Sequence, residues 1–175
     1  MSRVSKEGEL VMANIERLIF VCKENTARSI MAEFICRNMM GADQQIEIMS
    51  RGLVVLFPEP VNPKAEIVLI NHGMNLQERT ASQLQEEDFT DSTLVLTMDQ
   101  KQKKMIMRDF EKTSHVHTLK EYVSEDGDVM NPYGGNLVDY EDCYVELVRL
   151  IKKTVIKLNR RFEALQTEKV LSLNL

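Results

Sequence analysis

Glycine, proline and long apolar runs are all scarce in this sequence. Its 7 glycines and 4 prolines are too few for a loop-dominated fold or a long flexible linker. No apolar run approaches the ~20 residues of a membrane-spanning helix. The polar first fourteen residues, MSRVSKEGELVMAN, lack the apolar stretch of a signal peptide. We therefore expect a cytoplasmic protein with no membrane partner.

Cysteine and basic charge are scarce too, and each shortage excludes a class of protein. The 3 cysteines, Cys22, Cys36 and Cys143, are an odd number and form no C-x-x-C pair. They predict neither a disulfide framework nor a zinc knuckle, and free thiols fit a reducing cytosol. The formal net charge of -5 provides no broad basic field, so we expect no nucleic-acid partner.

The residues that are plentiful are typical of one soluble globular domain. Hydrophobic residues make up 43% and charged residues 28% of the 175 residues, which is enough apolar material to bury a core without disulfide or metal staples. We predict a single domain over residues 15–162. Residues 1–14 are interpreted as an N-terminal arm and residues 163–175 as a C-terminal tail.

Short apolar segments alternate with segments of helical periodicity along this domain. Strands are predicted at residues 15–21, 46–50, 92–98 and 115–119. Helices are predicted at residues 29–40, 62–73, 82–88, 99–110 and about 138–161. Such alternation implies parallel strands joined by right-handed crossovers. We therefore predict an α/β fold, a flavodoxin-like three-layer α/β/α sandwich around a parallel sheet of roughly four strands.

Four of the predicted helices carry residues that are typical of helix ends. Gly41 stands where a C-terminal cap of the first helix belongs. Asn62 followed by proline begins the second helix, and Asp99 begins the fourth. Ser82 is the predicted cap of the short helix between them.

The segment that follows the first predicted strand carries the chemistry. The strand ends at Val21, at the sheet edge where reactive sites of this fold class lie, and residues 22–29 read Cys-Lys-Glu-Asn-Thr-Ala-Arg-Ser. The five residues between Cys22 and Arg28 are enough to curl a loop around a tetrahedral anion, with its amides and the helix start pointing inward. The same field favours a thiolate, which can attack phosphorus, and Arg28 can hold two phosphoryl oxygens.

Two smaller polar residues complete this loop. Ser29 can donate its hydroxyl to the thiolate, and Asn25 tolerates a left-handed backbone and can tie the loop down with its amide. A Cys-x5-Arg spacing also arises by chance, as a buried cysteine that ends a strand and an arginine on a helix surface. The strand before the loop, the helix after it, Asn25 and Ser29 together favour an anion-binding loop.

The loop and its surroundings resemble a known family. Residues 19–34, IFVCKENTARSIMAEF, closely resemble the signature of low-molecular-weight protein tyrosine phosphatases, in which a strand runs into Cys-x-x-Asn-x-x-Arg-Ser and then into a helix. Three further segments resemble that family, namely SRG at 50–52, LVLTMDQ at 94–100 and GDVMNPYGG at 127–135. The resemblance covers nearly the whole chain. It implies a cysteine-dependent protein phosphatase with phosphotyrosine as the expected substrate.

The resemblance also implies a role for each residue of the site. Cys22 is the nucleophile that forms a phosphocysteine, Arg28 stabilises the equatorial oxygens, and Ser29 supports the thiolate. The implied substrate-binding positions are Lys23, Glu24, Asn25, Thr26, Ala27 and, as an aromatic wall, Tyr133. Leu56 and Phe57 are candidates for the opposite wall. The expected partners are a phosphorylated protein or a small phosphomonoester, with inorganic phosphate or sulfate held in the loop. No metal or other cofactor is expected, because the loop and Arg28 supply the positive field.

Three positions depart from the family's pattern. The general acid is normally an aspartate before the proline, whereas here the residue is Asn131, whose neutral amide cannot protonate a leaving oxygen. Asp126 or Asp128 would replace it only if the loop reorients. Glu24 stands where the family has glycine, and it opposes anion binding unless it points to solvent. Ala27 replaces a second loop cysteine, so a protective disulfide with the nucleophile cannot form there.

A chain that keeps the anion-binding loop and loses the proton donor has further interpretations. One is a phosphate- or phosphoprotein-binding module with little turnover. Another is a protein arginine phosphatase, because Thr26 and TLKEYV at 118–123 resemble a bacterial branch of the family that removes phosphate from arginine. An arsenate reductase shares the fold but needs a relay of further cysteines, and the sequence has none between Cys36 and Cys143.

Overall fold

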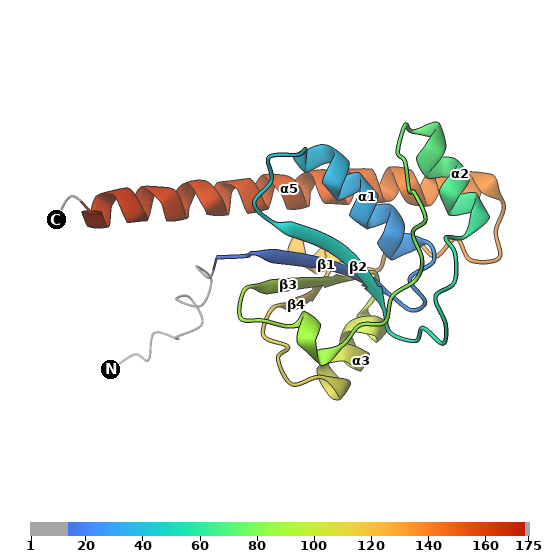
Figure 1. The fold of residues 1–175 in the computed structure, drawn as a ribbon, viewed down its shortest axis with the longest axis horizontal. Coiled ribbons are helices and arrows are strands. Elements are labelled where there is room, and N and C mark those ends of the chain that lie inside the picture. Colours follow the sequence, from blue (N-terminus) through green and yellow to red (C-terminus); the bar gives the residue numbers. More distant parts are fainter. Residues whose placement is uncertain (1–13, 174–175) are drawn as a thin grey trace.

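The computed structural model describes residues 14–173 (Figure 1). Its strands are β1 (Arg17–Cys22), β2 (Glu47–Gly52), β3 (Thr93–Thr97) and β4 (Val116–Thr118). Its helices are α1 (Arg28–Met40), α2 (Pro63–Asn71), the short 3₁₀ turn η2 (Glu86–Asp88), α3 (Gln100–Asp109), α4 (Leu119–Tyr122) and α5 (Leu137–Leu173). The predicted arm, residues 1–14, lies outside the described residues except for Asn14, and its interpretation stays a prediction.

The four strands form one parallel sheet in the order β2-β1-β3-β4. Because all strands run the same way, their carboxyl ends meet at one edge. In this register Cys22 lies beside Gly52, Val21 beside Thr97, and Thr97 beside Thr118. The predicted α/β sandwich with a four-stranded parallel sheet is confirmed, and Cys22 ends the strand at which the strand order reverses.

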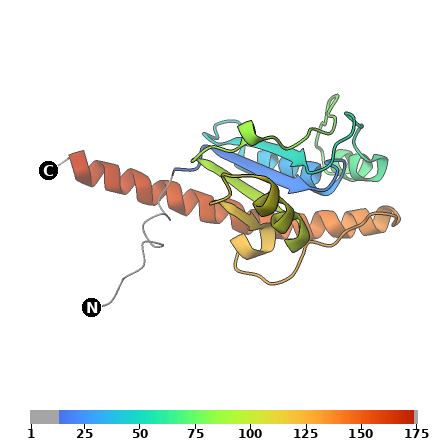
Figure 2. The ribbon, with the colours of Figure 1, turned by 90° about the horizontal axis from the view of Figure 1, so that it is seen from below.

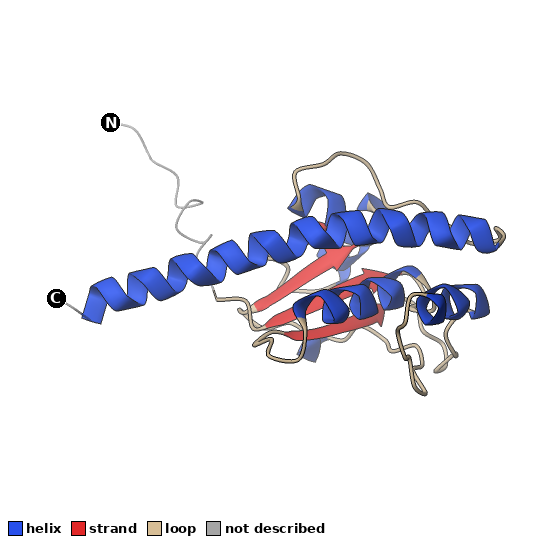
Figure 3. Ribbon diagram, turned by 90° about the horizontal axis from the view of Figure 1, so that it is seen from above, coloured by secondary structure: helices blue, strands red, loops and turns tan. Residues whose placement is uncertain are grey.

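Helices cover both faces of the sheet. Helices α1, α2 and α5 pack on one face, where α1 and α5 lie side by side (Figures 1 and 3), and α3 covers the other face (Figure 2). Side chains along β1 alternate between the two faces of the sheet. Phe20 and Cys22 belong to the core beneath α1 and α5. Ile19 and Val21 belong to the core beneath α3, where they are buried with Ile106. The nucleophile candidate therefore points to the same side as the helix that follows it.

Three of the four predicted capping residues lie at helix ends. Gly41 adopts a φ of 75° after α1, and its N–H donates to the carbonyl of Arg37. The Asn62 side chain accepts from two backbone N–H groups at the start of α2, and Asp99 accepts from the N–H of Gln102 at the start of α3. These ends are local in sequence, which is why the capping residues predict them well.

The helix predicted at 82–88 is wrong for most of its length. Only Glu86–Asp88 turns, as η2, and Ser82 is not its cap. Residues 82–84 instead run alongside the end of β2, where the N–H of Leu84 donates to the carbonyl of Gly52 at 2.8 Å and the Gln83 side chain accepts from the N–H of Val55 at 2.8 Å. These contacts to a segment 30 residues away satisfy the backbone better than one isolated helical turn.

Helix α5 is longer than the predicted 138–161. It continues to Leu173 because no glycine or proline follows Gly135 and the intervening residues are good helix formers. Its last fully buried residue is Leu158, and its C-terminal part extends beyond the sheet (Figures 1 and 3). Although α5 has 37 residues, none of the helices described between residues 14 and 173 is long and apolar enough to cross a membrane.

Candidate active site

The loop between β1 and α1 lies at the carboxyl edge of the sheet and is held by its own backbone. The carbonyls of Cys22 and Lys23 accept from the N–H groups of Leu53 and Val54, at 3.1 and 2.9 Å. Farther along, the carbonyl of Thr26 accepts from the N–H of Asn62 at 2.8 Å. Carbonyls of the loop are thus engaged on its outside, which leaves its N–H groups available to an anion on its inside.

The thiol of Cys22 is bound to Ser29. Cys22 Sγ lies 2.9 Å from Ser29 Oγ, and both residues are buried. Ser29 Oγ also accepts from Asn25 Nδ2 at 2.8 Å. Because Asn25 can only donate through that nitrogen, the hydroxyl hydrogen of Ser29 is free to point at the sulfur. The arrangement therefore places one O–H donor on the sulfur.

Asn25 is the central support of the loop. Its φ is 55°, the left-handed conformation that asparagine tolerates. Its Nδ2 also donates to Ser50 Oγ at 2.9 Å, and its Oδ1 accepts from the N–H of Ser82 at 2.9 Å. Gly52 permits this close packing, since a Cβ there would lie 3.0 Å from the Asn25 Cβ and 2.6 Å from a methyl group of Val55.

A buried charged cluster that no sequence motif indicates lies behind Asn25. The carboxylate of Glu33, only 2% exposed, accepts from Ser50 Oγ at 2.5 Å and from Arg79 at 3.0 Å, and it pairs with Arg37 at 2.9 Å. Arg79 also donates to Ser50 Oγ at 3.0 Å. The only sequence signal for this cluster is a charged residue on the buried face of α1, since Glu33 and Arg79 are 46 positions apart.

Arg28 reaches the site from the first turn of α1 and is held from two directions. It is 7% exposed, and its NH1 donates to the carbonyl of Val129 at 3.2 Å. Its NH2 lies 3.7 Å from a carboxylate oxygen of Asp99, the cap of α3. These contacts orient the guanidinium but leave other N–H groups of its planar fork for an oxyanion.

One cavity of about 630 Å³ brings most of the predicted site residues together. Its lining includes Cys22, Lys23, Glu24, Thr26, Ala27, Arg28, the segment Glu59, Pro60, Val61, Asn62, Pro63, and also Asn131, Pro132, Tyr133 and Tyr140. Asn25 and Ser29 do not line it and support it from behind. Leu56 and Phe57, the predicted opposite wall, are exposed and also do not line it. The 59–63 segment takes that position instead.

The side chain of Asn131, on the loop across the cavity, has fewer partners than those of Asn25 and Ser29. Asn131 is exposed, and its Oδ1 accepts from the N–H of Tyr133 at 3.2 Å, so the amide closes its own turn. Asp126 and Asp128 are exposed and do not line the cavity. Asp128 instead accepts from the N–H of Gln100 at 3.0 Å. In this arrangement the cavity presents an amide where the family's pattern has a carboxylic acid.

The other two cysteines are not equivalent to Cys22. Burial raises the pKa of Cys36 to about 12, and burial likewise raises the pKa of Cys143 to about 12. Both therefore remain protonated thiols at neutral pH, which makes them poor nucleophiles.

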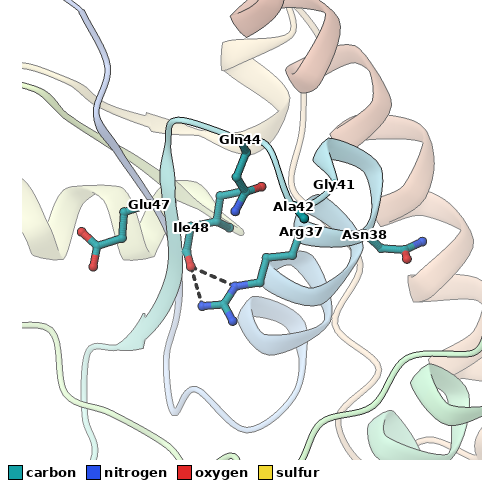
Figure 4. Close-up of a pocket in the computed structure, with 7 residues that line it drawn as sticks. All are labelled: Arg37, Asn38, Gly41, Ala42, Gln44, Glu47 and Ile48. Carbon is teal, nitrogen blue, oxygen red and sulfur yellow. Dashed lines mark hydrogen bonds between the residues drawn. The ribbon is translucent and has the colours of Figure 1, made fainter.

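A second hollow, of about 490 Å³, lies at the opposite end of the sheet, between the end of α1 and the start of β2 (Figure 4). There Arg37 donates to the carbonyl of Ile48 through two nitrogens, at 3.0 and 2.7 Å, and its charge is balanced by Glu33. The lining contains no nucleophile. We therefore take the cavity above Cys22 as the candidate active site.

Known proteins share this fold and loop. Residues 17–170 match the family described as low molecular weight phosphotyrosine protein phosphatase. A low molecular weight protein-tyrosine-phosphatase, PtpB of Staphylococcus haemolyticus, is 37% identical over 138 residues, which is 78% of this chain and 96% of PtpB.

Two similar solved structures are of YwlE arginine phosphatase. The one from Geobacillus stearothermophilus has a TM-score of 0.74 at 32% identity and covers 89% of this chain and 96% of that one. The other is a Cys-to-Ser mutant with a phosphorylated active site serine, with a TM-score of 0.76 at 32% identity, covering 82% of this chain and 95% of that one.

Proposed function

Because this chain belongs to the family of low molecular weight protein tyrosine phosphatases, we propose that it hydrolyses phosphotyrosine in proteins through a phosphocysteine on Cys22, without a carboxylic acid to protonate the leaving group. The observation that carries the proposal is the contact of 2.9 Å between Cys22 Sγ and Ser29 Oγ at the base of the cavity that Arg28 also lines. The phosphorylated serine of the YwlE mutant supports the covalent step, because that serine stands in place of a cysteine.

In the first step the Cys22 thiolate attacks phosphorus, an S–P bond forms, and the P–O bond to the tyrosine breaks. The loop N–H groups and the guanidinium of Arg28 bind the equatorial oxygens, whose charge is largest in the transition state. The phenolate leaves without a proton from Asn131, because an amide has none to give at neutral pH. It is protonated afterwards by water.

In the second step water attacks the phosphocysteine, inorganic phosphate forms, and sulfur leaves as a thiolate. Ser29 donates its hydroxyl hydrogen bond to that sulfur, which makes it a better leaving group. In a phosphatase with an acid, the same residue that protonates the first leaving group accepts a proton from this water. The Asn131 amide cannot do so, and both steps are therefore slowed.

The test is the rate of hydrolysis across a series of aryl phosphates whose leaving groups differ in basicity. We expect kcat/KM of the wild type to fall steeply as the leaving group becomes more basic, with phosphotyrosine slow and an activated aryl phosphate fast. Asn131→Asp should flatten that dependence and raise the rate on the poorest leaving groups by about 10²-fold.

Cys22→Ser provides the control, because it should abolish turnover throughout the series. If the wild type hydrolyses all the esters at similar speed and Asn131→Asp changes nothing, another acid is present and the proposed mechanism is wrong. Saturable binding of phosphopeptide with no product would instead identify a binding module.

A second candidate substrate, phosphoarginine, is favoured by one residue of the cavity. Thr26 lines it beside Cys22 and matches the threonine of the arginine phosphatase branch, and both YwlE structures are of arginine phosphatases. Comparing kcat/KM for phosphoarginine and phosphotyrosine peptides in the wild type and in Thr26→Ala separates the two. A preference for phosphoarginine that Thr26→Ala removes would support this second candidate.

A further inference from the structure

Four charged residues line the cavity, and one of them has no partner of opposite charge within residues 14–173. They are Lys23, Glu24, Arg28 and Glu59. Lys23 Nζ lies 3.8 Å from a carboxylate oxygen of Glu24, so these two charges largely cancel. Arg28, at the base of the cavity, lies 3.7 Å from a carboxylate oxygen of Asp99. Within residues 14–173, no ion pair or side-chain hydrogen bond involves the carboxylate of Glu59.

The backbone of Glu59 is fixed although its carboxylate is not paired. Its N–H donates to the carbonyl of Phe57 at 2.7 Å, and its carbonyl accepts from the N–H of Ala81 at 2.8 Å. The residue is half-buried, and the neighbouring Val61 is buried. The fold therefore holds an uncompensated negative charge on the wall of a cavity whose base binds an anion.

This charge acts differently on different substrates. A small phosphomonoester brings two negative charges and is repelled by Glu59, which weakens its binding. A substrate that also carries a cation at the height of Glu59 gains an attraction instead. Cys22 and Arg28, at the base, are only 5% and 7% exposed, whereas Glu59 is on the more open wall. A cation on a residue next to the phosphorylated one can therefore meet Glu59 while the phosphoryl group is at the base.

We propose that Glu59 selects phosphoproteins in which arginine or lysine stands next to the phosphotyrosine. The inference rests on the proposed function, whose substrate class it narrows. Lys23 is the one lysine of the cavity that would oppose this selection, and its pairing with Glu24 reduces that opposition.

The test uses three phosphotyrosine peptides that are identical except for arginine, glutamine or glutamate beside the phosphotyrosine. For the wild type we expect kcat/KM to fall in that order, by about tenfold from first to last, through KM and with little change in kcat. Glu59→Gln should reduce the ratio to about threefold, and Glu59→Lys should reverse the order. Raising the salt concentration should weaken the preference.

Glu168→Gln is the matched control, because it removes the same charge from the exposed C-terminal part of α5, away from the cavity. It should leave the preference unchanged. Equal kcat/KM for the three peptides in the wild type, or an unchanged order in Glu59→Lys, would overturn the inference.

A binding experiment separates this failure from failure of the proposed function. The Kd of each peptide for the Cys22→Ser variant should follow the same order, whether or not the wild type turns the peptide over. If turnover occurs and the Kd values are equal, Glu59 does not select. If turnover is absent and the Kd values follow the order, the selection stands and the catalytic proposal fails.

Discussion

The loop 22–29 and the loop 128–135 face the same cavity, but they differ in how firmly their functional side chains are held. In the first, Cys22, Asn25 and Ser29 are buried and joined by hydrogen bonds of 2.8 and 2.9 Å. In the second, Asn131 is exposed and bonds only to its own turn at 3.2 Å. On the proposed function, binding of a phosphoryl group and supply of a proton are thus separable. The first needs many fixed groups, whereas the second depends on one exposed side chain.

Arg28→Lys should produce the largest loss among substitutions that spare the nucleophile. A lysine cannot make the two parallel hydrogen bonds of a guanidinium, so the transition state loses a bidentate contact. We expect kcat on an activated aryl phosphate to fall by about 10²- to 10³-fold, measured by steady-state kinetics. A decrease of less than threefold would mean that Arg28 does not bind the reacting phosphoryl group.

Ser29→Ala tests the hydrogen bond to the sulfur. Loss of a bond to a charged group of this kind should lower kcat by about tenfold or more, with KM nearly unchanged, because the substrate itself is not contacted. Single-turnover kinetics should show the phosphocysteine hydrolysing more slowly. If KM rises and kcat stays constant, Ser29 only shapes the loop.

Asn25 should contribute to the stability of the protein through the first loop. Asn25→Ala removes three hydrogen bonds, leaves the N–H of Ser82 without its acceptor and places alanine at a φ of 55°, so we expect a loss of about 2–4 kcal/mol in the free energy of unfolding in urea. Asn25→Gly is the matched control, because it loses the same bonds without the backbone strain. It should be about 1 kcal/mol more stable than Asn25→Ala. If Asn25→Gly is less stable than Asn25→Ala, the left-handed backbone carries too little strain to offset the greater freedom of glycine in the unfolded chain.

Asp128→Asn should have the smallest effect, and it tests whether the second loop holds another general acid. The carboxylate only accepts from the N–H of Gln100, and an amide oxygen can do the same. We expect aryl phosphate kinetics within a factor of about two of the wild type. A tenfold loss confined to basic leaving groups would identify Asp128 as the missing acid.

How well the sequence predicts a feature depends on how far apart in the chain the interacting residues are. The strand alternation and the caps Asn62 and Asp99 depend on neighbours in the chain, and the structure confirms them. The interactions of Glu33 with Arg79 and of Ser82 with Asn25 join segments 46 and 57 positions apart, so no local pattern indicates them.

The same reasoning explains the wall of the cavity. Leu56 and Phe57 are the sequence's candidates for that wall, but they are 88% and 60% exposed. Hydrogen bonds from Asn62 to Thr26 and from Ala81 to Glu59 hold the 59–63 segment against the cavity instead. Both bonds connect segments far apart in the sequence.

The most direct test of the account is to trap the covalent intermediate. An activated aryl phosphate is mixed with the protein, the reaction is stopped with acid within milliseconds, and the peptides are analysed by mass spectrometry. The prediction is a burst of product close to one per protein, with one phosphoryl group on Cys22, because without a carboxylate at Asn131 the second step is the slower one. Turnover without a burst, or a phosphoryl group on any other residue, would contradict it.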